Sequence, residues 1–225
     1  MKIESEWNKQ INLSEANEDS DQATNSIEAQ VKTDIANGTL QLKWEWYLGN
    51  AKVEEAGKYL DLTQQYKKKI DTSAYVYKKT IYHIFCMTHL SLEERLENIQ
   101  AIIQFAKMRG QDIKLTNKDY QEVYERILYG GSYDKAKELA NHLKQQGVEM
   151  VVTSRMIKKY FKGAFDEGIY LDEAQGAINL AKESGIKFGV PKRFLQKKFN
   201  ESKQGDPRVV NQILEFAKEN NIELE

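Results

Sequence analysis

Apolar and polar residues recur at a regular interval over the C-terminal two-thirds of the chain. Four stretches end alike: an apolar residue is followed by glycine or asparagine four or five positions later, and another apolar residue comes shortly afterwards. The glycine and asparagine positions are Gly110, Gly147, Gly185 and Asn221, 36 to 38 residues apart. Because these residue types enter the left-handed backbone region at low cost, each predicts the end of a helix. A period of this length with two helices per repeat is typical of an α-solenoid.

Each repeat divides into a first helix, helix A, and a second, helix B. Helix-start signals lie in the turns, where Ser91 and Glu94 form a capping-box pattern and Asp206 precedes a proline. The sequence therefore predicts an all-α fold, a right-handed α-solenoid of antiparallel helix pairs, with four αα-hairpin repeats and a divergent N-terminal helical unit. The predicted A and B helices are 73–88 and 92–109, 117–129 and 133–146, 153–166 and 171–184, and 191–202 and 206–220.

The N-terminal third has a different composition, and the chain is expected to have three parts. Residues 1–25 form a polar tail with six acidic and two basic residues, which predicts either a mobile segment or one that screens a basic groove. Residues 26–70 form a helical cap unit, and residues 71–225 form the repeat domain. Within the cap, residues 40–46 alternate like a strand, but an isolated strand would lack a pairing partner, so we expect a short helix followed by a longer one over 51–69.

The second repeat resembles the pentatricopeptide repeat. It has a tyrosine in the first turn of helix A (Tyr120), a Gly130-Gly131 turn, an acidic residue two before alanine (Asp134 and Ala136) and a Gly-Val close. The third repeat matches at Asp172, Ala174 and Gly185-Ile186, whereas the first and fourth match only at their ends. The resemblance, shared with tetratricopeptide-type repeats, covers about residues 73–225.

The resemblance implies a superhelix whose A helices line a concave groove. In pentatricopeptide proteins this groove binds single-stranded RNA, and a polar residue in the first turn of helix A reads one base together with the last residue of the repeat. The first-turn candidates here are Gln121 and Lys159. The closing positions fall near Val151 and Gly189, which are not the expected Asp or Asn, and this departure argues against a base-reading code.

Charge is unevenly distributed although the net charge of the chain is only −1. The A helices together are basic and the B helices are slightly acidic, so a polyanion would be attracted to the A-helix side. Lysines that merely solvate a helical surface are the alternative interpretation. The candidate nucleic-acid-binding residues interleave with Tyr160, Phe161 and Phe194, and they are Lys78, Lys79, Arg155, Lys158, Lys159, Lys162, Lys192, Arg193, Lys197 and Lys198.

Candidate catalytic and metal-binding groups are few. His83, Cys86 and His89 lie three residues apart, but a structural zinc site needs four ligands and the chain has one cysteine, so helix packing is the better interpretation. The Glu93-Glu94 pair is better explained as a favourable interaction with the helix dipole than as catalytic carboxylates. The sequence therefore predicts no catalytic residues, no metal site and no cofactor.

The predicted function is that of a non-catalytic binding or regulatory protein. Its A-helix groove would engage a macromolecule, with single-stranded RNA or another nucleic acid as the first choice. The alternative is a tetratricopeptide-like adaptor that binds a peptide or protein. No apolar run is long enough for a membrane span, and the single cysteine fits a reducing compartment, so we expect a cytoplasmic protein without a membrane partner. The sequence makes no prediction of oligomeric state.

Overall fold

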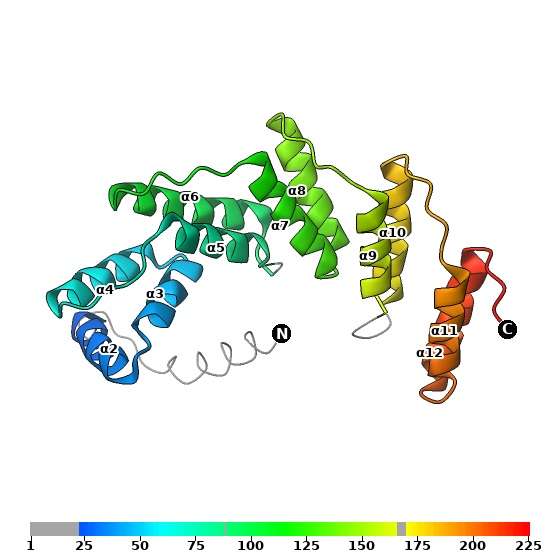
Figure 1. Ribbon diagram of the computed structural model, residues 1–225, viewed down its shortest axis with the longest axis horizontal. Helices are drawn as coiled ribbons and strands as arrows, with labels where there is room; N and C mark the ends of the chain where they lie inside the picture. The colour runs from blue at the N-terminus through cyan, green and yellow to red at the C-terminus, as the bar shows by residue number, and fades with distance from the viewer. Residues whose placement is uncertain (1–22, 88, 166–169) are drawn as a thin grey trace. The chain divides into compact units, whose positions relative to one another are not determined.

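The computed structural model describes residues 23–87, 89–165 and 170–225, and these residues form helices and no strands (Figure 1). The all-α prediction is therefore confirmed for the described part of the chain. The acidic tail predicted for residues 1–25 lies almost entirely outside it. The helices are α2 (Ala23–Asn37), α3 (Leu40–Gly49), α4 (Val53–Gln65), α5 (Ala74–Phe85), α6 (Leu92–Met108), α7 (Asn117–Tyr129), α8 (Tyr133–Gln145), α9 (Ser154–Gly163), α10 (Leu171–Glu183), α11 (Lys192–Ser202) and α12 (Pro207–Glu219).

The predicted repeat helices correspond one to one with α5 to α12, and each observed end lies within three residues of the predicted one. The strand-like segment 40–46 is helical, as expected, and forms most of α3. The helix predicted over 51–69 is shorter and ends at Gln65. None of the described helices combines the length and apolar character needed to cross a membrane.

The helix ends follow the predicted pattern closely. Gly110, Gly147, Gly185 and Asn221 all have positive φ, between 55° and 80°. After each of them, the next backbone N–H donates to a carbonyl five residues back, as Val148 does to Leu143 at 2.9 Å. This arrangement satisfies carbonyl groups that a helix end otherwise leaves unpaired.

The same helix end also follows α4, as it does α2, α3 and α7. A fainter copy is suggested in the sequence at Lys69-Ile70, but the left-handed residue is Lys67, with φ 55°. The N–H of Lys68 donates to the carbonyl of Thr63 at 3.1 Å. Lysine at this position obscures the repeat in the sequence because the motif usually selects glycine or asparagine.

The chain divides into two compact units, each described by itself. The first comprises Met1–Ile81 and Ile99–Ile113. In it, α4 packs against α2 and α3, and the core is aromatic: the ring of Trp44 meets Tyr77 edge-on at a centroid distance of 5.7 Å. The buried Tyr59 hydroxyl donates to Asp34 at 2.7 Å, which gives the buried carboxylate a partner.

The second unit comprises Tyr82–Asn98 and Lys114–Glu225. Its helices pair as α7 with α8, α9 with α10, and α11 with α12 (Figure 1). Between pairs, α7 contacts α9, α8 contacts α10, and α10 contacts α12. Helices A therefore contact helices A and helices B contact helices B. An ion pair between Lys137 of α8 and Glu183 of α10, at 2.7 Å, joins two of the B helices.

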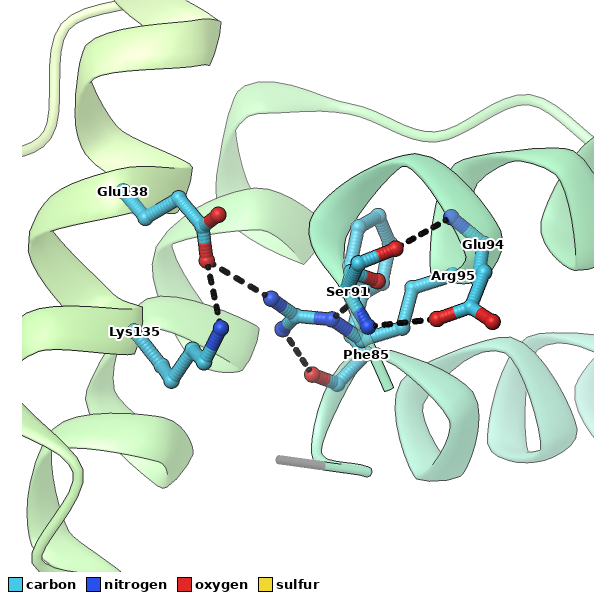
Figure 2. A network of polar contacts seen from close by, with 6 residues as sticks. All are labelled: Phe85, Ser91, Glu94, Arg95, Lys135 and Glu138. Carbon is cyan, nitrogen blue, oxygen red and sulfur yellow. Dashed lines mark hydrogen bonds and ion pairs between the residues drawn. The ribbon is translucent and has the colours of Figure 1, made fainter. Parts of the chain in front are cut away.

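A buried arginine supports the start of the second unit. The Arg95 side chain is fully buried and donates to the carbonyls of Phe85 at 2.8 Å and Ser91 at 3.2 Å (Figure 2). It also forms an ion pair with Glu138 of α8 at 3.1 Å, and Lys135 approaches the same carboxylate at 3.3 Å. Arg95 thus links the end of α5 and the start of α6 to α8.

Candidate nucleic-acid interface

The ten basic residues proposed from the sequence fall in both units. Lys78 and Lys79 lie on the part of α5 that belongs to the first unit, whereas the other eight lie on α9 and α11 of the second unit. Lys79 forms an ion pair with Glu45 at 2.9 Å and thus already has a partner within its own unit. The concentration of basic residues is therefore greatest in the second unit.

Helix α9 separates its charged and apolar residues sharply. The Thr153 side chain caps the helix by accepting from the N–H of Met156 at 3.2 Å. Its apolar residues are buried, and these are Met156, Ile157, Tyr160 and Phe161. Its basic residues are exposed, and these are Arg155, Lys158, Lys159 and Lys162. The periodicity that buries one face of α9 therefore presents four cations on the other.

Helix α11 is built in the same way but with more internal pairing. Leu195 and Phe199 are buried, while Lys192, Arg193 and Lys197 are exposed. Lys197 and Lys198 both lie near the carboxylate of Glu201, at 3.7 and 3.8 Å. Exposed pairs at such distances contribute little to stability, and they leave the lysines able to exchange Glu201 for another anion.

Cations lie close to aromatic rings at several places on the A helices of the second unit. Arg126 of α7 lies over the ring of Tyr82 at 5.6 Å. Lys159 of α9 lies over the ring of Tyr129 at 3.9 Å. Lys162 of α9 and Lys198 of α11 lie near the ring of Phe194 at 5.9 and 5.8 Å. We call this set of seven residues the cation–aromatic series.

The rings of this series differ from those expected from the sequence. Tyr160 and Phe161 are buried and pack between helices, whereas Phe194 is half-buried and remains in the series. Tyr82 and Tyr129 were missed, and both are half-buried. The available signal was their place at the ends of A helices, where each faces a cation of the next A helix. Burial raises the pKa of Tyr129 above its usual value, Glu125 adds to the rise and Arg155 opposes it.

The two positions that would read a base contact each other instead. The side-chain amide of Gln121 accepts from the N–H of Val151 at 2.9 Å and donates to its carbonyl at 3.0 Å. Gln196 makes the same pair of bonds with the backbone of Glu225, at 2.9 and 2.6 Å. In the first unit Gln41 does so with Asp71, at 2.7 and 3.3 Å. We call each of these arrangements a glutamine clamp.

Gln121 is the fifth residue of α7. The fifth residue of α9 is Lys158, not Lys159. A lysine has no acceptor atom and cannot form both bonds of a clamp. At the first-turn position that the pentatricopeptide resemblance assigns to base reading, Gln121 thus makes internal contacts, and the following repeat has a lysine.

The histidines and the cysteine do not gather into a metal site. Helix α5 ends at Phe85, so Cys86 and His89 lie beyond it while His83 lies within it. Nowhere in residues 23–87, 89–165 and 170–225 do three or more His, Cys, Asp or Glu side chains come together in a way that could hold a metal ion.

No protein-family model matches the chain, and no curated protein matches it.

Proposed function

We propose that this protein is a non-catalytic binding protein whose A-helix face in the second unit engages single-stranded RNA. The helix pairs of that unit would form a right-handed α-solenoid of the pentatricopeptide or tetratricopeptide type, with α7, α9 and α11 on the binding side. The contacts of A helices with A helices and of B helices with B helices support this arrangement.

The cation–aromatic series is the observation that supports the proposal. Proteins that bind single strands without reading their sequence combine a basic path for the phosphates with aromatic rings for the bases. Base stacking contributes about 1–3 kcal/mol per base, and the phosphates contribute a term that weakens with salt. The half-buried rings of Tyr82, Tyr129 and Phe194 are spaced over three A helices, and each has at least one cation beside it.

The glutamine clamps indicate that binding would be independent of sequence. The amide of Gln121 uses its donor and its acceptor on the backbone of Val151, which removes the groups that would discriminate between bases. Phosphate contacts and stacking remain, and neither distinguishes one base strongly from another.

The test is fluorescence anisotropy with a labelled oligouridylate of about twelve nucleotides, a length within the usual range of single-strand sites. Titrations run from about 50 to 200 mM salt, where counterion release is readily measured. The key variant replaces Lys159, Lys162 and Lys198 with Gln. The matched control replaces Lys144, Lys182 and Lys218, which are exposed on B helices of the same unit, with Gln.

We expect the A-helix variant to bind more weakly and to lower the slope of log affinity against log salt by about 2, since each single-strand phosphate contact contributes about 0.7. The B-helix control should stay close to the unaltered protein. Equal losses in the two variants, or no binding by the unaltered protein, would contradict the proposal. Binding of an acidic peptide in place of the oligonucleotide would favour the peptide-binding adaptor.

A further inference from the structure

The glutamine clamp recurs at a fixed place in the repeats. In α7 and α11 the glutamine is the fifth residue of the helix, and its partner is the fourth residue after the left-handed helix-end residue: Val151 after Gly147, and Glu225 after Asn221. A side-chain amide suits this task because it has a donor and an acceptor side by side, matching the C=O and N–H of one residue. The clamp joins helix A of a repeat to the connector that follows its helix B.

The third repeat has the same register but not the same chemistry. The fifth residue of α9 is Lys158, and the fourth residue after Gly185 is Gly189. Among the described residues, neither the ammonium group of Lys158 nor the backbone N–H of Gly189 has a hydrogen-bond partner, and both residues are exposed. The ammonium group can donate to a carbonyl, but it offers no acceptor for the N–H of Gly189.

We propose that this place binds one phosphate group, which supplies the acceptor that the third repeat lacks. A phosphate oxygen would accept from the N–H of Gly189, and another would accept from the ammonium group of Lys158. The proposal rests on the proposed function, because the phosphate would be one link of the RNA backbone.

Two further features suit an anion at this position. Gly189 has no side chain, and nothing lies within 4 Å of the place where a Cβ atom would be, so a ligand can reach its backbone. The surrounding charge is positive: Lys192 and Arg193 follow within four residues, and neither α9 nor α11 has an acidic residue in its first turn. An anion there is attracted by several cations and meets no nearby carboxylate in those turns.

A swap of residues between repeats tests the proposal. Lys158→Gln should complete a clamp with Gly189 and remove the phosphate contact. We expect it to raise the melting temperature while lowering oligouridylate affinity about fivefold, and to reduce the salt slope by about 0.7, the contribution of one single-strand phosphate. Lys182→Gln, on helix B of the same repeat, is the matched control, because it removes the same charge from an exposed site outside the binding face and cannot form a clamp.

The reciprocal variant is Gln121→Lys, which should lower the melting temperature by opening the clamp of α7 and should steepen the salt slope. The proposal is overturned if Lys158→Gln keeps the slope of the unaltered protein, or if it matches Lys182→Gln in both slope and melting temperature. In either case oligonucleotide binding by the unaltered protein would leave the proposed function standing.

A second measurement follows the site without RNA. In the ¹⁵N-labelled full chain, titration with pyrophosphate should shift the amide resonance of Gly189, and this shift should be absent in Lys158→Gln. If pyrophosphate shifts Gly189 but oligonucleotide does not bind, the phosphate site stands and the proposed function falls. If the Gly189 resonance does not respond, the site is refuted even where RNA binds.

Discussion

Replacement of Arg95 by methionine should destabilise the second unit more than any neighbouring change of charge. The Arg95 side chain is completely buried, and its donors satisfy the carbonyls of Phe85 and Ser91 as well as the carboxylate of Glu138 (Figure 2). Methionine retains a linear apolar stem but offers no donor. The carbonyl of Phe85 would therefore lose its partner in a buried bond, whereas the carbonyl of Ser91 would still accept from the backbone N–H of residue 95, at 3.1 Å.

The expected cost follows from these contacts. An unpaired buried polar group such as the Phe85 carbonyl costs about 1–3 kcal/mol, and the Ser91 carbonyl adds little because it keeps a backbone donor. Against this, the variant no longer has to bury a guanidinium charge, which offsets part of the loss. We therefore expect Arg95→Met to lower the free energy of unfolding by about 1–3 kcal/mol.

Two variants in the same network serve as comparisons. Glu138→Gln should cost about 1–2 kcal/mol, below the range for a fully buried pair, because the Glu138 side chain is 39% exposed and water reaches it. Lys135→Gln should change stability by less than about 0.5 kcal/mol, as for other exposed ion pairs. The assay is urea denaturation followed by circular dichroism. A cost below about 0.5 kcal/mol for Arg95→Met, or a larger cost for Glu138→Gln, would refute this reasoning.

Two further predictions concern single sites. Gly176→Ala should destabilise the α9–α10 pair by about 1–3 kcal/mol, measured by thermal denaturation. The new Cβ would lie 2.9 Å from the Tyr160 hydroxyl and 3.2 Å from the Tyr133 Cβ. An unchanged melting temperature would show that both tyrosine side chains move aside freely. Glu94 accepts from the N–H of Ser91 at 2.8 Å, and this bond lowers the pKa of its carboxyl below the usual 4.5. The contribution of this carboxylate to stability is present above pH 4.5 and is lost as the pH falls through the lowered pKa. Glu94→Gln should therefore lose less stability than the unaltered protein between about pH 5 and pH 2. Equal losses of unfolding free energy in the two proteins over this range would contradict the assignment.

The sequence predicted the helices well because their ends depend on local chemistry. A left-handed glycine or asparagine and a capping residue act within about five residues of the helix end, so Gly147 and Asp206 are visible in the sequence. Contacts between helices were harder to predict. In the sequence, Arg95 is one charged residue among several on a B helix, but its side chain is buried and pairs with Glu138, forty-three residues away. Nothing in the local pattern distinguishes it from an exposed arginine.

In the candidate site, too, local features can be read from the sequence, whereas contacts between helices cannot. Helical periodicity accounts for the exposure of Arg155, Lys158, Lys159 and Lys162, which lie on the face of α9 opposite its buried residues. It could not show that Tyr129 lies under Lys159, because that contact depends on how α7 packs against α9. Nor could it show that Gln121 binds Val151, since the clamp joins residues thirty positions apart across a helix pair.

The two residues of a glutamine clamp should differ in how many substitutions they tolerate. The partner of the glutamine contributes only a peptide N–H and C=O, and the partner positions indeed hold three unlike residues, Asp71, Val151 and Glu225. Substitutions there should accumulate freely, with proline as the exception because it has no N–H. The glutamine itself accepts almost no replacement, since no other long side chain presents a donor and an acceptor side by side. We therefore expect the glutamine of each clamp to tolerate few substitutions and its backbone partner to tolerate many.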